Sequence, residues 1–542
     1  MDDTVDLDRF ASRRSVAYAS RGMVATSQPL AAEAGVSVLR DGGNAFDAAV
    51  ATAAALNVVE PTSTGLGGDV FALYRTADDE IGGLRSCGGA PDEATIENVR
   101  DSIADSDADP ADAEMPFTGP HTVTVPGTAR GWEATISELG SLTLADVLEP
   151  AIEYATEGYP VSPVIAHHWK AAENLFTDEH AREAFLPAGR APAAGEKARL
   201  EKLGRTMERI AAEGADVLYE GEVGEAIAAE VREKGGFLAE ADLAAFTPEF
   251  VNPVSTTYGG AEIYELGPNN QGLLALEALN LAEAVDAGEH PPGSADSIHY
   301  SAEAMKRAFH DGHFYTTDPE YETIPPLHEK AYAAERAEGI TEQATPAAEV
   351  GVGIPDSGAE DADTVLLCVA DEAGNVVSYI NSRFAGFGSG LVAGDTGIAL
   401  QNRGASFSLD PEHPNSLAPG KRPFHTLIPG LAKLDTEDWL AFGVMGGYMQ
   451  PQGHLQVLSH LLDGDRSLQA ALDAPRWRYR EDGRLAVESR FDPEVLTALA
   501  RRGHDVTVAP PSAFGGGQLV RNREGVLSGA TEPRKDGVAI GY

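Results

Sequence analysis

The chain has 542 residues, which is enough for two to four domains or for one large layered domain. Hydrophobic residues make up 43% of it, a share typical of globular proteins that excludes a disordered or fibrous chain. Its 85 Asp and Glu residues against 40 Lys and Arg residues give a formal net charge of −45, so we expect a surface that repels nucleic acid and anionic membranes.

The negative charge is spread along the whole chain and fits two interpretations. In a salty cytoplasm the Debye length shrinks to about 3 Å at molar salt, and such screening tolerates strong self-repulsion. An acidic surface could instead steer a cationic substrate towards a site. We favour the first interpretation, although the composition is compatible with both.

Nothing in the sequence indicates export or membrane insertion. The first ten residues, MDDTVDLDRF, are acidic and lack the apolar core of a signal peptide. The longest apolar stretch, residues 48–59, is too short to span a bilayer. Only two cysteines occur, Cys87 and Cys368, so neither a disulfide framework nor a thiolate metal cluster is expected. We therefore expect a soluble, cytoplasmic protein.

The first part of the chain predicts two helices followed by a strand. Residues 29–39 have a helical apolar period, and an Ala-rich helix follows from residue 44 or 45 to about 58. A Gly-rich turn at residues 65–68 leads into a short apolar strand at residues 70–74. Residues 101–114 are acidic and contain proline, which predicts a surface loop.

The middle of the chain is predicted to be mainly helical. From residue 126 to about 236, apolar residues recur at helical spacing, most clearly at residues 129–139 and 145–154. Residues 270–315 predict two further helices. Residues 335–362 are polar and rich in Glu, Ala, Gly and Pro, and they have little to bury.

After residue 363 the sequence becomes rich in β-strand patterns. This change in sequence pattern places a boundary near residue 363, between a mainly helical portion, 1–363, and a β-rich portion, 364–542. One helix is predicted within the second portion, at residues 452–462. The strand-like runs are TVLLCVA (364–370), VVSYINS (376–382), FGSGLV (387–392), GIAL (397–400), TLIPGLAKL (426–434) and WLAFGVM (439–445).

The first two of these runs predict a hairpin that brings two hydroxyls together. The loop between them, residues 371–375, contains Gly374, which can adopt a positive φ. A turn centred on Ala373 places Thr364 opposite Ser382, whereas a bulge at Gly374 would shift the pairing by one residue. Opposed side chains have Cβ atoms about 5 Å apart, which is close enough for their hydroxyls to hydrogen-bond.

Such a pair has a chemical use if the chain is cut before Thr364. A threonine hydroxyl is a poor nucleophile until a base removes its proton. The α-amino group freed by the cut, with a pKa of roughly 8, belongs to the same residue and can be that base. Ser382 would orient the hydroxyl. Thr and Ser are also ordinary strand residues, so the pattern by itself does not assign these roles.

Several blocks of the sequence resemble the γ-glutamyltransferase (γ-glutamyltranspeptidase) family. They include RGMVATSQPLAAEAGVSVLRDGGNAFDAAVATAAALNVVEPTSTGLGGDVF (21–71), VPGTARGW (125–132) and DTVLLCVADEAGNVVSYINS and its continuation (363–409). APGKRPFHTLIPGL (418–431) and GVMGG (443–447) follow in the family's order and spacing. The resemblance covers nearly the whole chain after residue 20.

The resemblance implies an α+β fold, a four-layer αββα sandwich of the N-terminal-nucleophile (Ntn) hydrolase type, built from one self-cleaving precursor. The cut would fall between Asp363 and Thr364 and give two chains, 1–363 and 364–542, that stay together as one interdigitated catalytic domain. The family's nucleophile corresponds to Thr364, and its assisting hydroxyl to Ser382 in place of the usual threonine. The oxyanion hole corresponds to N–H groups of Gly446 and Gly447, where small residues allow an alkoxide to approach to about 3 Å.

The substrate pocket departs from the family's pattern. One cation and one anion are missing from their usual places, and Arg403 has appeared nearby. Because a planar guanidinium favours a carboxylate, Arg403 suggests an anionic acyl group that lacks the free amino acid end. The altered positions are Cys87 near the place of the carboxylate-binding arginine, with Arg85 displaced; Ser406 for an aspartate; Arg403 for a glutamine; Phe384 for an asparagine; and His425 and Thr426 for paired serines.

The expected function is a self-processing N-terminal-threonine amidohydrolase or acyltransferase that acts on γ-glutamyl groups of glutathione and related amides. One alternative is an amidohydrolase or acylase of the same superfamily acting on a different anionic acyl amide, oxamate-like or a β-lactam side chain. Others are a transferase with amino acid or peptide acceptors and a non-catalytic homologue. The expected partners are a small amide substrate and the two cleaved chains, which bind each other.

The other residues with catalytic or metal-binding side chains are interpreted as structural. Cys368 is a rival nucleophile on the same strand face as Thr364, but a lone Cys in an apolar strand is usually a buried hydrophobe. His310 and His313 lack the spacing and the partner acid of a zinc motif. Neither Gly-rich turn matches a phosphate loop. We therefore expect no metal and no cofactor.

Overall fold

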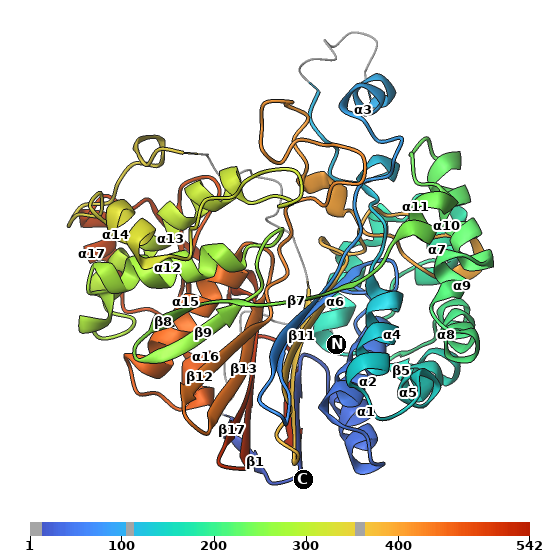
Figure 1. The fold of residues 1–542 in the computed structure, drawn as a ribbon, viewed down its shortest axis with the longest axis horizontal. Coiled ribbons are helices and arrows are strands. Elements are labelled where there is room, and N and C mark those ends of the chain that lie inside the picture. The colour runs from blue at the N-terminus through green and yellow to red at the C-terminus, as the bar shows by residue number, and fades with distance from the viewer. Residues whose placement is uncertain (1–13, 104–112, 353–363) are drawn as a thin grey trace.

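The fold is a stack of two β-sheets between two layers of helices. The computed structural model describes residues 14–103, 113–352 and 364–542. Figure 1 shows the sheets side by side, with the helices of residues 29–59 and 128–245 against one and the helices from residue 272 onward against the other. This is the predicted α+β, four-layer αββα arrangement.

Each sheet has seven strands, and every neighbouring pair is antiparallel. Both sheets draw strands from residues 1–363 and from residues 364–542, so the two predicted portions are interleaved. The first sheet has the order β19 (Val538–Gly541), β2 (Gly22–Thr26), β10 (Val365–Asp371), β11 (Val376–Ser382), β3 (Asp69–Arg75), β4 (Ile81–Ser86) and β7 (Glu249–Val251). The second has the order β1 (Ala17–Ala19), β18 (Val526–Thr531), β17 (Gly516–Arg523), β13 (Asp438–Met445), β12 (Gly430–Asp435), β9 (Ala261–Glu265) and β8 (Val254–Tyr258).

The core between the sheets is built by alternation along their strands. Leu366 and Cys368 of β10 pack with Leu431 of β12 and Ala441 of β13 in one buried apolar cluster. The residues between them, such as Leu367, belong to the cluster on the helix side. Because β10 is covered on both faces, its sequence is apolar at every position from Val365 to Ala370 rather than alternating.

Helix α2 (Ala45–Val59) packs directly on β10 and β11 and is buried over its entire length. Its small alanine side chains let the helix lie close to the sheet while α1 (Pro29–Arg40) and α5 (Leu144–Glu157) cover its outer side. Asn44 caps its first turn by accepting from the Phe46 and Asp47 N–H groups, as Asn does at helix starts. The predicted helices at residues 29–39 and 44–58 are thereby confirmed.

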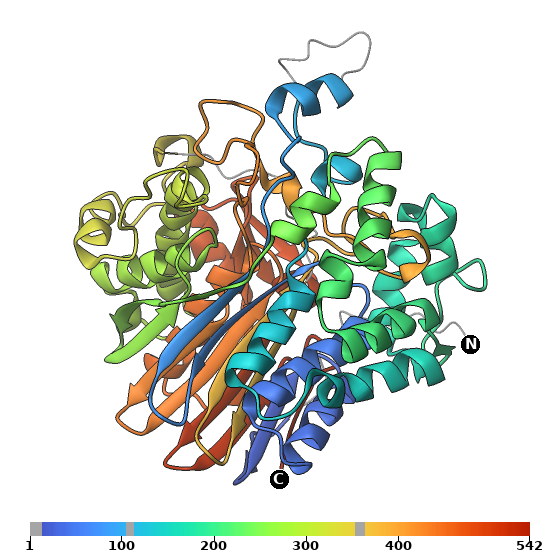
Figure 2. The ribbon, with the colours of Figure 1, turned by 45° about the vertical axis from the view of Figure 1, so that its right-hand side comes forward.

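The other helices except α3, which stands apart at the top of both views, complete the two outer layers, and Figure 2 shows those of the first layer gathered on one side. No helix among the described residues is both long and apolar enough to cross a membrane. The α-helices other than α1, α2 and α5 are α3 (Ile96–Ile103), α4 (Thr128–Leu139), α6 (Pro163–Ala171), α7 (Glu179–Phe185), α8 (Glu201–Glu213), α9 (Asp216–Tyr219), α10 (Glu222–Glu233), α11 (Glu240–Ala245), α12 (Gly272–Ala284), α13 (Ala295–Tyr315), α14 (Lys330–Ala337), α15 (Met449–Leu462), α16 (Leu468–Asp473) and α17 (Pro493–Arg501). Two small sheets join β5 (Tyr159–Pro160) to β6 (Lys197–Ala198), and β14 (Trp477–Tyr479) to β15 (Leu485–Glu488) and β16 (Val506–Ala509).

The predicted β10–β11 hairpin is present in the predicted register. Val365 pairs with Asn381, so Thr364 comes next to Ser382 at the open end. The Asp371 carboxylate accepts from the N–H groups of Gly374 and Asn375 and fixes the turn. Gly374 has a φ of +103°, as a tight connection requires, and the ladder contains no bulge.

Other predictions of local structure were wrong. Residues 387–392 and 397–400 form turns and isolated bridges instead of strands, because glycines at positive φ interrupt the extended backbone. Residues 101–103 end helix α3 rather than beginning a loop, and residues 104–112 lie outside the described ones. Among the strands that were not predicted are β7, β8 and β9, which are three to five residues long and do not alternate regularly between buried apolar and exposed polar side chains.

Candidate active site

Thr364 and Ser382 form a hydrogen-bonded hydroxyl pair at the open end of the hairpin. Thr364 Oγ1 donates to Ser382 Oγ at 3.3 Å, and both side chains are fully buried. The third strand, β3, pairs with β11 so that Asp69 lies opposite Ser382. Three polar residues therefore stand side by side where three apolar strands meet the loops.

The Ser382 hydroxyl is held by the backbone that follows it. The Phe384 N–H donates to Ser382 Oγ at 2.9 Å, and the Ala385 N–H donates to the Asn402 side chain at 3.1 Å. Phe384 has a φ of +82°, an uncommon conformation for an aromatic residue, and it turns the chain sharply after the strand. The serine oxygen accepts from both Phe384 and Thr364, which fixes the direction of the Thr364 hydroxyl.

Gly446 and Gly447 form a turn between β13 and α15, here called the glycine turn. Both have positive φ, +117° and +55°, and a Cβ on Gly446 would lie 3.0 Å from the Gly515 backbone. Their N–H groups donate to no other described residue, which leaves them available to an oxyanion. The Gln271 side chain donates to the carbonyls of Gly447 at 2.9 Å and Thr426 at 2.7 Å, and so ties the turn to the next loop.

The glycine turn lies at the same end of the stacked sheets as Thr364. The Ser378 hydroxyl donates to the Phe442 carbonyl at 2.9 Å, and Gly443 faces the Leu366 side chain. Leu366 pairs with Ile380, so it is nearer than Ser378 to the open end of the hairpin. The chain of β13 from Phe442 towards the glycine turn therefore runs alongside the hairpin towards Thr364.

Arg403 is a buried cation with unsatisfied donors, and it contacts the Phe384 ring two residues after Ser382. Its Nη1 donates to Thr426 Oγ1 at 2.9 Å, and its guanidinium carbon lies 4.5 Å from the centre of the Phe384 ring. The side chain is fully buried, yet its Nε and Nη2 atoms have no hydrogen-bond partner among the described residues. Because buried donors are normally satisfied, the free N–H groups indicate a place for an anion.

Asp69 and His425 form a second buried polar pair. His425 Nδ1 accepts from the Leu427 N–H at 3.2 Å, so Nε2 carries the proton and donates to Asp69 Oδ2 at 3.0 Å. Asp69 Oδ1 accepts from the Gly127 N–H at 3.0 Å and the Gln401 side chain at 3.1 Å. Asp69 is therefore fully engaged and anchors three separate loops beside Ser382.

Burial governs the ionisation of this cluster. Desolvation raises the pKa of Asp69 to about 7, against the opposing effect of Arg403 and two hydrogen bonds. Desolvation, with a smaller contribution from Arg403, holds the pKa of His425 well below its ordinary value, so His425 is neutral. Burial lowers the pKa of Arg403 to about 10, which leaves it charged at neutral pH.

The structure thus joins most of the predicted site residues through contacts. Hydrogen bonds and one cation–π contact run from Thr364 through Ser382, Phe384, Arg403 and Thr426, and then through Gln271 to the glycine turn. Ser406 is the exception. It ends the 3₁₀ turn Arg403–Ser406, and its buried hydroxyl has no hydrogen-bond partner among the described residues. Asp363 lies outside the described residues.

The displaced Arg85 and the two cysteines have other surroundings. Arg85 pairs with Glu249 at 2.6 Å and donates to the Pro268 carbonyl, so it is occupied on β4. Burial raises the pKa of the Cys87 thiol to about 12. Cys368 donates from its Sγ to the Gln518 carbonyl at 3.4 Å across the inter-sheet core, and burial raises its pKa as well. Both thiols are thus poor nucleophiles.

Sequence reasoning missed Asp69, Gln401 and Gln271. A carboxylate between a Gly-rich turn and the apolar run of residues 70–74 was the available signal for Asp69. Gln401 and Gln271 carry no comparable signal, because their partners are 332 and 155 residues away in sequence.

Comparison with known proteins places this geometry among related enzymes. The family model described as gamma-glutamyltranspeptidase matches residues 31–542. The glutathione hydrolase-like YwrD proenzyme of Bacillus subtilis (strain 168) is 37% identical over 96% of this chain and 98% of its own length. The oxamate amidohydrolase proenzyme of Klebsiella pneumoniae subsp. pneumoniae is 34% identical over 96% of this chain and 99% of its own.

Among solved structures, the cephalosporin acylase from Bacillus halodurans is similar over nearly the whole chain. It matches with a TM-score of 0.90 and 44% sequence identity, covering 98% of each chain. The arrangement of sheets, helices and hairpin described above is therefore that of a known enzyme architecture.

Proposed function

Because the chain belongs to the gamma-glutamyltranspeptidase family of Ntn hydrolases, we propose that it is a self-processing amidohydrolase with Thr364 as its nucleophile. The family is one of hydrolases and transpeptidases, and this protein is an enzyme of that type. Processing would cut the peptide bond between Asp363 and Thr364, with water adding across it. The new chain would then begin with the α-amino group of Thr364.

The proposed reaction uses four groups of the site. The freed α-amino group takes the proton from Thr364 Oγ1, and Oγ1 attacks the carbonyl carbon of the substrate amide. The N–H groups of Gly446 and Gly447 stabilise the resulting oxyanion. The ammonium proton passes to the departing amine as the C–N bond breaks. Water then hydrolyses the ester on Thr364, or an acceptor amine replaces water.

The acyl group is proposed to carry a carboxylate and no free α-amino group. The observation that carries this proposal is Arg403, a buried cation with two unpaired donor atoms, stacked on Phe384. Ser406 stands where an aspartate for an α-ammonium is expected, and the Asp69 oxygens already accept three hydrogen bonds. Oxamate-like amides and the acidic side chains of β-lactams fit this description.

A γ-glutamyl substrate such as glutathione is the second candidate. Its support is the glutathione hydrolase-like relative at 37% identity. A γ-glutamyl group has the same carboxylate as the first candidate plus an α-ammonium. The two candidates thus differ by one group whose binding can be measured.

The test compares glutaryl-p-nitroanilide with γ-glutamyl-p-nitroanilide, since these substrates differ only by the α-amino group. We expect the glutaryl compound to have a kcat/KM at least about tenfold higher, equivalent to ~1.4 kcal/mol of differential transition-state binding. A preference for the γ-glutamyl compound would reject the first candidate in favour of the second. Product analysis with and without glycylglycine separates hydrolysis from acyl transfer.

A further inference from the structure

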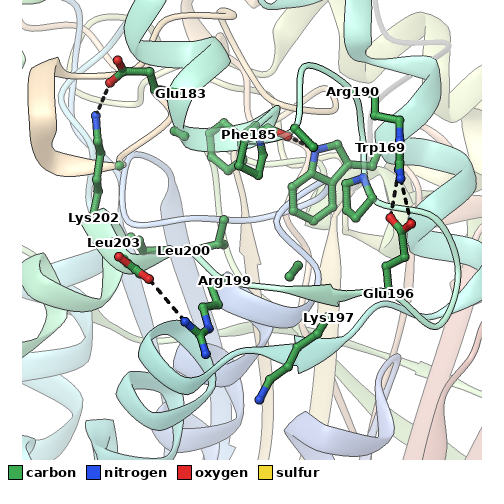
Figure 3. Close-up of a pocket in the computed structure, with 17 residues that line it drawn as sticks. Trp169, Glu183, Phe185, Arg190, Glu196, Lys197, Arg199, Leu200, Lys202 and Leu203 are labelled. Atoms are coloured by element: carbon green, nitrogen blue, oxygen red, sulfur yellow. Dashed lines mark hydrogen bonds and ion pairs between the residues drawn. The ribbon is translucent and has the colours of Figure 1, made fainter.

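An open cavity of about 470 Å³ in the first helical layer is separate from the candidate active site. Figure 3 shows that charged side chains around it pair with one another, such as Lys202 with Glu183. None of the site residues described above lines it. A further role in the proposed reaction falls instead on a buried carboxylate at the Thr364 end of the hairpin.

Glu60 is a carboxylate at the end of helix α2. It directly follows the last residue of the helix and is 2% exposed. Ser27 Oγ donates to Glu60 Oε2 at 2.6 Å, and Ser63 Oγ donates to Glu60 Oε1 at 3.0 Å. Both oxygens therefore accept hydrogen bonds, as those of an ionised carboxylate do.

The chain on either side of Glu60 is tied to the chain on either side of Ser382. Asn57, one helical turn before Glu60, donates from Nδ2 to the side-chain oxygen of Asn381 at 3.0 Å. The Arg383 guanidinium donates to the carbonyl of the residue directly after Glu60. The backbone of Glu60 is therefore held at the end of β11, next to the residue that bonds the proposed nucleophile.

The Glu60 side chain reaches the strand on the other side of β10. In the sheet β10 lies between β2 and β11, and Ser27 comes directly after the last residue of β2. Thr26 Oγ1 donates to the Leu366 carbonyl at 3.0 Å, so this end of β2 lies beside the start of β10. With its backbone at β11 and its carboxylate at Ser27, Glu60 spans the start of β10, where Thr364 stands.

We propose that Glu60 binds the α-amino group of Thr364 once the chain has been cut, and so positions the base of the reaction. This role rests on the proposed function, since the uncut chain has no such amino group. When the amino group takes the proton from Thr364 Oγ1 it becomes an ammonium, and the carboxylate stabilises that charge. The ammonium keeps the proton until it passes to the departing amine, so Glu60 itself stays ionised.

This role has a signature in the pH dependence of kcat/KM. A carboxylate beside an amine favours the ammonium and raises the pKa of the amine. The charged groups near this end of the sheets also include Asp69, Arg383 and Arg403, and Glu532 with its partner Arg534 after β18. Since the pKa of Asp69 is about 7, this residue alone could produce an acid limb, so Asp69→Asn is measured in parallel.

The test compares wild type and Glu60→Gln on glutaryl-p-nitroanilide and γ-glutamyl-p-nitroanilide. We expect Glu60→Gln to be cut like the wild type, because the amino group forms only after the cut. Its kcat/KM should fall at least about tenfold at the plateau, and its acid limb should move to lower pH by about one unit. Glu60→Asp keeps the charge and should return the limb to the wild-type position.

Asp47→Asn is the matched control. Asp47 is a buried carboxylate on the same helix that accepts from the N–H groups of Ser141 and Leu142, and it lies about 20 Å from Glu60 at 1.5 Å per residue. Its replacement should leave the acid limb in place. An unmoved limb in Glu60→Gln, or a limb lost only in Asp69→Asn, would overturn the proposal. An uncut Glu60→Gln chain would also overturn it and assign Glu60 to the cutting step.

A thermal comparison separates failure of this proposal from failure of the proposed function. An uncut wild-type chain would reject the N-terminal nucleophile, and Glu60 with it. A cut wild type that hydrolyses neither anilide would reject only the substrates. Even then, Glu60→Gln should lower the melting temperature of the cut protein by about 2 °C more than that of the uncut Thr364→Ala chain, since only the cut protein has the amino group. Equal losses in the two backgrounds would refute the contact.

Discussion

Asp69 and Arg403 are buried opposite charges near one another, yet no hydrogen bond joins them. The Asp69 oxygens accept hydrogen bonds from Gly127, Gln401 and His425. Arg403 donates one hydrogen bond, from Nη1 to Thr426. Asp69 therefore lowers the cost of burying the guanidinium through space without occupying its remaining donors. This division of roles underlies the first two predictions.

Replacing Arg403 should abolish recognition of the acyl carboxylate and leave self-processing intact. We expect Arg403→Gln to lower kcat/KM for glutaryl-p-nitroanilide about 100-fold, because one buried charge-assisted contact contributes roughly 2–4 kcal/mol. Arg403→Lys should recover little, because an ammonium cannot bind a carboxylate in the same planar fashion. Denaturing mass spectrometry provides the control for processing. Wild-type kcat/KM in Arg403→Gln would remove Arg403 from the substrate site.

Asp69 should make stability depend on pH in a direction opposite to that of a salt-bridged carboxylate. Its folded pKa of about 7 is above the unfolded value, so its stabilising effect is complete below about pH 4 and is lost as the pH rises towards 7. Relative to Asp69→Asn, the wild type should thus lose up to ~4 kcal/mol of unfolding free energy between pH 4 and 8. Urea unfolding at several pH values measures it, with the exposed Asp101→Asn as control. Parallel pH profiles for wild type and Asp69→Asn would contradict the assignment.

At the scale of elements, the hairpin was predictable and the loop after it was not. Five residues between two apolar runs, with one glycine, allowed a short list of registers, and the observed register matched one of them. Residues 387–400 have apolar runs of similar quality, but glycines such as Gly388 and Gly390 take positive φ and fold them into turns. Asp69 and Gln401 lie inside blocks that resemble the family, yet their places in the site depend on contacts between residues more than 300 positions apart, which a sequence pattern does not show.

The glycine turn offers a prediction about an element. Gly446→Ala should lower kcat about 100-fold, because the new Cβ meets the Gly515 backbone and moves a proposed oxyanion donor worth roughly 3 kcal/mol. Gly525→Ala is the matched control, since Gly525 also has positive φ, +80°, but has open space around it. Gly525→Ala should lose about 1 kcal/mol of stability from the left-handed backbone, Gly446→Ala should lose more because of the Gly515 contact, and only Gly446→Ala should lose activity. Equal kcat values in the two variants would exclude the turn from catalysis.

At the scale of the whole molecule, the interleaved sheets predict how the processed protein behaves. β10 begins one residue after the proposed cut and lies between β2 and β11, in the middle of a sheet that uses strands of both portions. We expect two chains, 1–363 and 364–542, by denaturing mass spectrometry, and a single particle by native mass spectrometry. Thr364→Ala should remain one chain. An intact wild-type chain that hydrolyses amides would refute the N-terminal nucleophile.

The net charge of −45 has a consequence for a protein proposed to take an anionic substrate. At low salt the acidic surface should repel the glutaryl anilide, and since the Debye length falls from about 10 Å at 0.1 M to about 3 Å at 1 M, salt should relieve that repulsion. We therefore expect kcat/KM for the glutaryl compound to rise with KCl relative to that for the uncharged butyryl-p-nitroanilide. The melting temperature should rise over the same range as self-repulsion is screened.

A surface that steers cationic substrates would instead show kcat/KM for a cationic acyl anilide that is high at low salt and falls as KCl is added. A melting temperature independent of KCl would argue against adaptation to a salty cytoplasm, so the two measurements together separate the two interpretations of the charge.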